Sequence, residues 1–190
     1  MVGKYTGLSD SYLSVIKALQ HSAFAVNRKL IIDWIESTNL DPIERTPMYD
    51  AAWKILKAAD GILVPGGFGN RGVEGKIAAA NYARVNNVPY LGVCLGLQIA
   101  TIEFCRNVLG LDGANSAEFD EHAPVQAVVF MPEISKTHMG GTMRLGVYPA
   151  RLAEGSRIAA MYADNLVYER HRHRYEVNND YRSPMEEEGL

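Results

Sequence analysis

Cys94 lies between two glycines in the run Gly92-Val93-Cys94-Leu95-Gly96, where an apolar segment typical of a strand meets one typical of a helix. Small neighbours permit the sharp strand-to-helix turn, or nucleophile elbow, that presents a side chain above a sheet. The first N–H groups of the helix would favour the thiolate and leave the Leu95 N–H for an oxyanion. These residues predict a catalytic thiol at Cys94, and the alternative is a small buried cysteine in a tight turn.

A glycine-rich loop upstream favours the catalytic alternative. The run Ile62-Leu63-Val64 is typical of a short buried strand, and it leads into Pro65-Gly66-Gly67-Phe68-Gly69. Open α/β sheets place their ligands at the C-terminal ends of strands, and glycines let backbone amides approach a substrate carbonyl closely. Together with the elbow one strand-helix unit later, this loop predicts a site with an oxyanion hole.

Alternating helical and strand patterns would position the two loops. Helical spacing predicts helices from Leu13 to Val26 after the capping candidates Ser9 and Asp10, from Thr46-Pro47 through Leu56, from Gly75 to Val85 and from Leu95 to Leu109. Apolar runs predict strands over 30–35, 62–64 and 88–93, and more strands between Val125 and Leu152 with a turn at Gly140-Gly141. This order predicts a three-layer α/β domain with a mainly parallel central sheet.

Length, composition and charge limit the kinds of protein that this chain can be. With 190 residues, 47% of them hydrophobic and 22% charged, the chain is expected to bury one core as one globular domain. The net charge of -3 gives no reason to expect a nucleic-acid partner. The sequence contains no run long enough to span a bilayer and no signal-peptide pattern, so we expect a cytosolic protein without a membrane partner. Two cysteines without paired spacing argue against a disulfide framework, and Cys105 is expected to pack in a core.

Five blocks of sequence carry a resemblance to a known family. They are 65–76, 92–96, 115–120, 139–146 and 169–178, which read PGGFGNRGVEGK, GVCLG, NSAEFD, MGGTMRLG and ERHRHRYEVN. In this order they resemble a class I glutamine amidotransferase domain, and in particular that of the CTP synthase family. The resemblance covers nearly the whole chain and implies a flavodoxin-like version of the predicted α/β fold.

The resemblance implies hydrolysis of L-glutamine through a covalent intermediate. Cys94 would attack the side-chain amide to give a γ-glutamyl thioester and ammonia, after which water releases glutamate. The backbone amides of Gly67 and Leu95 would hold the oxyanion. The remaining substrate pocket would comprise Gly96, Leu97 and Gln98 on the elbow helix, Glu118 for the α-ammonium group and Arg174 for the α-carboxylate.

Two parts of the family pattern are missing from the 190 residues. The His-Pro-Glu motif that supplies the catalytic histidine and glutamate would follow Arg174 but is absent, so we expect residues 1–190 to form a glutaminase domain of poor activity. The sequence also lacks a phosphate-binding P-loop and the synthase domain that converts UTP to CTP. The resemblance therefore implies a synthase domain of the same polypeptide as partner, with ATP and Mg bound there, no cofactor in this domain, and a homotetrameric enzyme.

The histidine pair His171 and His173 offers another possible site. A His-x-His pair can bind zinc or serve a thiol as base. Each histidine is followed by an arginine, and the family match points to Arg174, so we predict neither a metal site nor a catalytic histidine here. Two other functions stay open: another cysteine hydrolase of the same fold, such as a γ-glutamyl hydrolase, and a catalytically silent interaction module, in which Cys94→Ala would change nothing.

Overall fold

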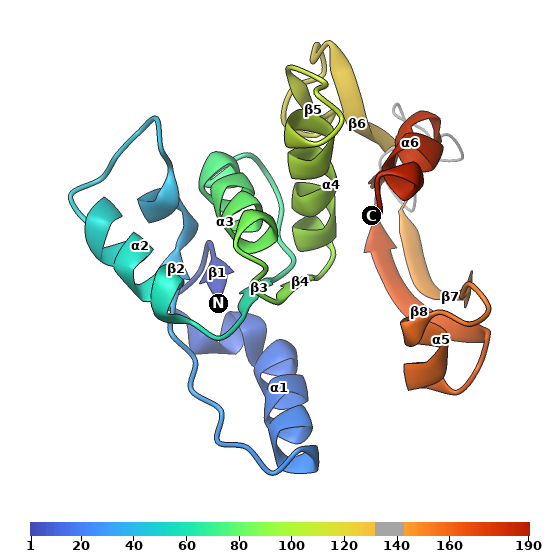
Figure 1. Ribbon diagram of the computed structural model, residues 1–190, viewed down its shortest axis with the longest axis horizontal. Helices are drawn as coiled ribbons and strands as arrows, with labels where there is room; N and C mark the ends of the chain where they lie inside the picture. The colour runs from blue at the N-terminus through green and yellow to red at the C-terminus, as the bar shows by residue number, and fades with distance from the viewer. Residues whose placement is uncertain (132–142) are drawn as a thin grey trace. The chain divides into compact units, whose positions relative to one another are not determined.

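The computed structural model describes residues 1–131 and 143–190, and the described residues divide into two compact units (Figure 1). Unit 1 comprises Met1–Val129 and Val177–Leu190, and unit 2 comprises Phe130–Glu176. The predicted turn at Gly140-Gly141 lies outside the described residues.

Unit 1 contains the predicted alternation of strands and helices. Its elements are β1 (Val2–Gly3), η1 (Ser9–Tyr12), α1 (Leu13–Ala25), β2 (Ile35–Glu36), η2 (Ser37–Leu40), α2 (Tyr49–Ala58), β3 (Ile62–Val64), α3 (Val73–Val85), β4 (Tyr90–Gly92), α4 (Leu95–Asn107), β5 (Ala114–Ser116), most of β6 (Val125–Phe130), η3 (Asn179–Tyr181) and α6 (Arg182–Glu187). The strands β1 and β2, β3 and β4, and β5 and β6 pair in parallel. The predicted α/β class with parallel strands is therefore confirmed.

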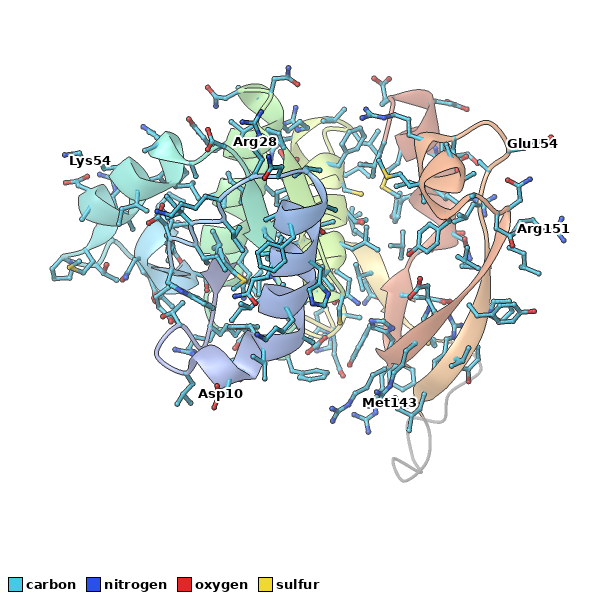
Figure 2. The ribbon with its side chains drawn as sticks, turned by 90° about the horizontal axis from the view of Figure 1, so that it is seen from below. Asp10, Arg28, Lys54, Met143, Arg151 and Glu154 are labelled. Atoms are coloured by element: carbon cyan, nitrogen blue, oxygen red, sulfur yellow. The ribbon has the colours of Figure 1, made fainter. Side chains whose placement is uncertain are left out.

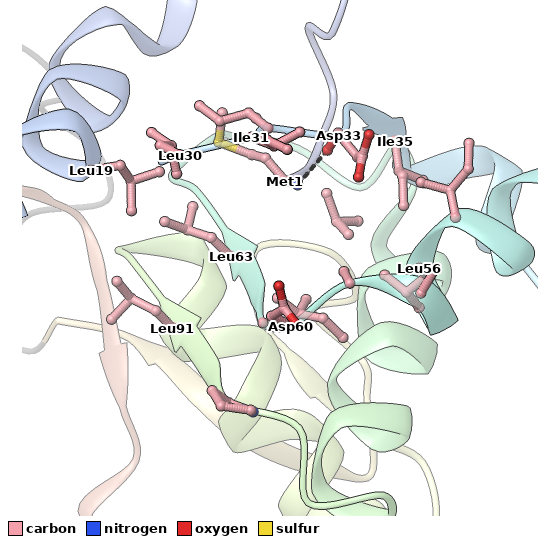
Figure 3. A pocket seen from close by; sticks show the side chains of 18 of the residues that line it. Met1, Leu19, Leu30, Ile31, Asp33, Ile35, Leu56, Asp60, Leu63 and Leu91 are labelled. Carbon is pink, nitrogen blue, oxygen red and sulfur yellow. Dashed lines mark hydrogen bonds between the residues drawn. The ribbon is translucent and has the colours of Figure 1, made fainter. Parts of the chain in front are cut away.

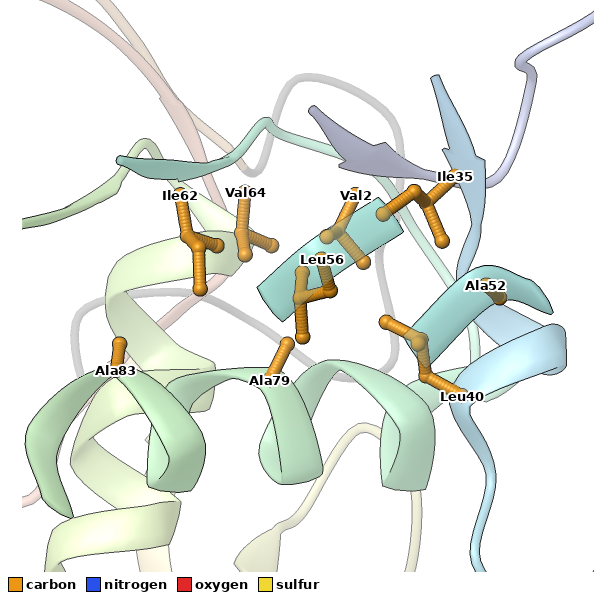
Figure 4. Close-up of a cluster of buried hydrophobic side chains, with 9 residues drawn as sticks. All are labelled: Val2, Ile35, Leu40, Ala52, Leu56, Ile62, Val64, Ala79 and Ala83. Atoms are coloured by element: carbon orange, nitrogen blue, oxygen red, sulfur yellow. The ribbon is translucent and has the colours of Figure 1, made fainter. Parts of the chain in front are cut away.

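The core of unit 1 lies between its strands and the helices α2 and α3 (Figure 4). Its buried side chains are Val2, Ile35, Leu40, Ala52, Leu56, Ile62, Val64, Ala79 and Ala83. The alanines of α3 are small enough to let this helix lie close to the strands, and α3 in turn packs on α4, which begins at the elbow. Burial of this apolar surface stabilises the strand ends that carry the two candidate loops.

Two local predictions are wrong. Residues 30–34 form no strand, because the pairing with β1 covers only Ile35 and Glu36, and Leu30, Ile31 and Ile32 line a cavity instead. The chain is already helical at Asp10, which lies in the first turn of η1, so this residue does not cap a helix. The other helices begin and end within about three residues of their predicted bounds.

Unit 2 is built on an antiparallel hairpin of β7 (Arg144–Arg151) and β8 (Leu166–His173), joined through α5 (Arg157–Tyr162) and followed by β9 (Tyr175–Val177). The pairing runs from Arg144 opposite His173 to Arg151 opposite Leu166. Ser156 caps α5, because its Oγ accepts a hydrogen bond from the Ala159 N–H at 3.1 Å. Charged side chains such as Arg151 and Glu154 extend from this unit into solvent, as Lys54 and Arg28 do from unit 1 (Figure 2).

Candidate functional site

The turn at Cys94 has the backbone of a nucleophile elbow. Cys94 joins β4 to α4 with φ 57° and ψ -107°, a conformation that a residue with a β-carbon rarely adopts. A β-carbon on Gly92 would lie 2.4 Å from the backbone of Gly96, and one on Gly96 would lie 2.0 Å from the Val64 carbonyl oxygen. The two flanking glycines are therefore required by close backbone contacts, as the sequence pattern predicts.

The glycine-rich loop meets the elbow at the C-terminal edge of the strand pair. Val64 and Gly92 are register partners, and the Val93 N–H donates a hydrogen bond to the Val64 carbonyl at 2.9 Å. A β-carbon on Gly66 would lie 3.3 Å from Cβ of Cys94. The parallel register thus brings the loop backbone into contact with the candidate nucleophile.

The thiol of Cys94 is half-buried and accepts hydrogen bonds from the backbone of Leu95 and Gly67. Burial raises the pKa of this thiol, the two backbone hydrogen bonds lower it, and the nearby Glu118 carboxylate raises it, with a net increase above the ordinary value. The Leu95 N–H at the helix terminus therefore favours the thiolate as predicted, but burial has the larger effect on the pKa. Dehydration of the sulfur outweighs the two amides, so a base must remove the proton when the thiol reacts.

Glu118 lies beside the glycine-rich loop. It follows β5, and its Oε1 accepts a hydrogen bond from the Gly69 N–H at 2.8 Å. The side chain is half-buried, and its charge acts on both Cys94 and Lys4. Glu118 is thus among the residues that the structure brings together around the elbow.

The first turn of α4 carries the other predicted pocket residues. Leu95 and Gln98 are buried, with 1% and 8% of their surfaces exposed, whereas Leu97 is 54% exposed. The N–H groups of Leu97 and Gln98 donate to the Cys94 carbonyl at 3.1 and 3.3 Å, which starts the helix at the nucleophile. Leu97 therefore presents an apolar side chain to solvent from the first turn of α4.

Arg174 belongs to unit 2, where it lies between β8 and β9. Its carbonyl accepts a hydrogen bond from the Met131 N–H at 2.9 Å, and its Nε is buried without a hydrogen-bond partner among the described residues. A buried guanidinium N–H without a partner is costly unless a ligand or water accepts from it.

The two histidines of β8 contact each other edge to face. Their ring centroids lie 5.5 Å apart, and Tyr148 contacts His171 at the same centroid distance. Burial, His171 and Arg144 together lower the pKa of His173. Among residues 1–131 and 143–190, no group of three or more His, Cys, Asp or Glu side chains is arranged to hold a metal ion. In the same residues, no helix is both long and apolar enough to cross a membrane.

Sequence reasoning missed Lys4. This residue follows β1, is 5% exposed, and donates through Nζ to the carbonyl oxygens of Phe68 and Gly69 in the glycine-rich loop. The signal that could have revealed it is a lysine directly after the buried pair Val2–Gly3, because lysine is rarely buried without a partner.

A cavity of about 590 Å³ lies elsewhere in unit 1 (Figure 3). Most of its lining is apolar, and it includes Leu30, Ile31, Leu63 and Leu91. The N-terminal ammonium of Met1 donates to the Asp33 carbonyl at its rim at 2.6 Å. Neither Cys94 nor the glycine-rich loop lines this cavity, so it is separate from the candidate site at the elbow.

Comparison with known proteins agrees with the geometry of the elbow. The family model of class I glutamine amidotransferases matches residues 8–190. A solved structure described as a Trypanosoma brucei CTPS glutaminase domain with bound acivicin has a TM-score of 0.88 and 45% identity to this chain. The similarity covers 99% of this chain and 70% of that one.

Curated relatives extend the similarity over the whole chain. CTP synthases of Dictyostelium discoideum and Listeria innocua are each 53% identical to all of this chain, and that of Schizosaccharomyces pombe is 52% identical. The chain covers 35%, 35% and 33% of these three proteins, so it spans about a third of the length of the relatives it matches.

Proposed function

The chain belongs to the class I glutamine amidotransferases and, within them, to the glutaminase domains of CTP synthases, and from this we propose that Cys94 attacks the side-chain amide of L-glutamine. One observation carries the proposal: the backbone of Gly67 and of Leu95, from two separate loops, converges on the Cys94 sulfur. Two backbone N–H groups beside the nucleophile lie close to the carbonyl that it would attack, where such donors can stabilise an oxyanion.

The reaction has two steps. The Cys94 sulfur bonds to the amide carbon, and the negative charge that develops on the amide oxygen is stabilised by the N–H groups of Gly67 and Leu95. The carbon–nitrogen bond then breaks, and the nitrogen leaves as ammonia with the proton lost by the thiol. Water adds to the resulting thioester, giving glutamate and restoring the thiol. Because the pKa of the Cys94 thiol is raised, the first proton transfer needs a base, the role that the resemblance gives to a histidine.

Charged groups would orient the substrate. Glu118 would bind the α-ammonium group. Its place beside the glycine-rich loop supports this role, because the Gly69 N–H donates to one of its two carboxylate oxygens, Oε1, and orients the carboxylate. Arg174 would bind the α-carboxylate, which is supported by its buried Nε without a hydrogen-bond partner among the described residues. Leu97 and Gln98, with Gly96, would line the pocket along the first turn of α4.

For the whole protein, we propose that the ammonia passes to a synthase domain that converts UTP to CTP. That domain would use ATP and Mg, whereas the glutaminase reaction itself needs neither. The resemblance and the relatives' names support this partner. The tetrameric assembly and the cytosolic location stay predictions.

Covalent trapping tests the proposal. The diazoketone analogue of glutamine should form a thioether with Cys94: the sulfur bonds to the diazo carbon, the thiol proton moves to that carbon, and dinitrogen leaves. We expect one adduct per chain by intact mass, placed on Cys94 by peptide mapping, absent in Cys94→Ala and slowed by excess L-glutamine. Cys105→Ala is the matched control and should react like the wild type, because Cys105 is fully buried. Labelling that free glutamine does not slow would reject the glutaminase and favour another cysteine hydrolase of this fold.

A further inference from the structure

A lysine from another part of the chain, Lys4, holds the glycine-rich loop. Lys4 comes from the end of β1 and extends its ammonium group to the carbonyl oxygens of both Phe68 and Gly69. It is 5% exposed, although lysine is among the residues least often buried. A buried ammonium group that donates to two successive carbonyls fixes the orientation of both peptide units.

Lys4 is itself held in place by its backbone. Its N–H donates to the hydroxyl oxygen of Tyr12 at 3.1 Å, and its carbonyl accepts from the Arg71 guanidinium at 2.5 Å. Arg71 forms an ion pair with Glu36 at 3.2 Å. The backbone of Lys4 is therefore held on two sides. From this fixed backbone its side chain can hold the loop in one position.

The loop is held on its other side by Glu118, which accepts from the Gly69 N–H. The carbonyls of Phe68 and Gly69 thus accept hydrogen bonds from Lys4, and the Gly69 N–H donates to Glu118, the proposed partner of the substrate's α-ammonium group. Gly67, whose backbone meets the Cys94 sulfur, directly precedes Phe68. Glycines have the largest conformational freedom of any residue, so a loop with three of them needs external anchors to hold one amide in one direction.

We propose that Lys4 is a positioning residue for the glutaminase reaction: by holding the Phe68 and Gly69 carbonyls, it aims the Gly67 amide at the oxyanion. This inference rests on the proposed function of Cys94. Lys4 itself would touch neither the substrate nor the sulfur, and its contribution would be to the geometry of the oxyanion hole and to the loop beside Glu118.

A matched pair of buried lysines tests the inference. Lys4→Met removes the two loop contacts, whereas Lys76→Met removes a second buried lysine, 1% exposed, whose Nζ has no hydrogen-bond partner among the described residues. Both variants remove a buried amine and retain an unbranched side chain. The measured quantity is the ratio of two Cys94 alkylation rates on the purified protein, with the diazoketone analogue of glutamine and with iodoacetamide, which needs no oxyanion hole.

We expect the ratio to fall about ten- to a hundred-fold in Lys4→Met and to keep its wild-type value in Lys76→Met. General loosening of the fold would change the iodoacetamide rate as well, so a lower ratio at an unchanged iodoacetamide rate separates positioning from stability. If Lys4→Met does not fold, Arg71→Met, whose side chain is 55% exposed, should lower the same ratio to a smaller extent. An unchanged ratio in the folded variant would overturn the role of Lys4, whereas a wild-type protein that shows no preference for the glutamine analogue would instead reject the proposed function.

Discussion

Gly96 lies so close to β3 that a β-carbon on it would be 2.0 Å from the carbonyl oxygen of Val64. The contact joins the first turn of α4 directly to the strand that precedes the glycine-rich loop. It sets how near the helix N-terminus comes to the edge of the sheet, and hence where Leu95 and Cys94 lie. Side chains can repack, but two backbones in contact can separate only by moving a whole element.

We therefore expect Gly96→Ala to lower the free energy of unfolding by about 3 kcal/mol or more, because α4 must shift away from β3. Urea denaturation measures this change. Gly7→Ala is the matched control: nothing lies within 4 Å of its added β-carbon, so its effect should be within about 0.5 kcal/mol. Equal effects of the two substitutions would refute the proposed backbone contact.

The backbone of Cys94 predicts an unusual order of stability among variants. At φ 57° and ψ -107° a β-carbon is strained, so Cys94→Gly should be more stable than Cys94→Ala by about 1 kcal/mol. At Cys105, inside α4, the order should be reversed by about 1 kcal/mol, since glycine is the poorer helix former. Both pairs can be compared by thermal unfolding. An alanine variant at position 94 that equals or exceeds the glycine variant would contradict a strained elbow.

Glu118→Gln should change the two reactivities of Cys94 in opposite directions. The Glu118 carboxylate raises the pKa of the thiol, so its neutralisation should lower that pKa and speed iodoacetamide alkylation at pH 7 to 8. The glutamine analogue should react more slowly, because its α-ammonium group loses the proposed carboxylate partner. Glu121→Gln, which removes an exposed carboxylate nearby, serves as the control for net charge and should change neither rate. Two rates that rise together would argue against substrate binding by Glu118.

The ion pair between α3 and α4 predicts a pH-dependent stability. Glu103 is 2% exposed and accepts hydrogen bonds from Arg84, Asn81 and Asn107. Burial alone would raise the Glu103 pKa, but these partners lower it below its ordinary value. The stabilisation is therefore present at neutral pH and is lost as the pH falls through the folded-state pKa.

On this basis Arg84→Met should cost about 1–3 kcal/mol at pH 7, since it leaves a buried carboxylate without its cation. The cost should shrink in acid, where the protonated Glu103 no longer needs the guanidinium. Urea unfolding at several pH values measures both effects. Arg182→Met, which removes an exposed pair with Glu186 at 3.6 Å, should cost less than about 0.5 kcal/mol at every pH. A cost of Arg84→Met that does not vary with pH would mean that Glu103 is not its main partner.

The sequence alone determined the parts of the molecule that depend on short-range chemistry. Helical spacing located α1 to α4, the apolar run at Ile62 located β3, and the spacing of Gly92, Cys94 and Gly96 indicated the elbow. Each of these signals lies within a few residues of the feature it predicts, and close backbone approach leaves glycine as the only residue that fits.

Only the tertiary structure decided the properties that depend on residues far apart in the chain. Residues 30–34 form no strand despite their apolar run, because a strand exists only where a partner backbone pairs with it. The pKa of the Cys94 thiol is raised rather than lowered, because burial by the whole fold outweighs the nearby helix terminus. Lys4 reaches Phe68 and Gly69 only after β1 and the glycine-rich loop come together, so no local pattern could assign its role.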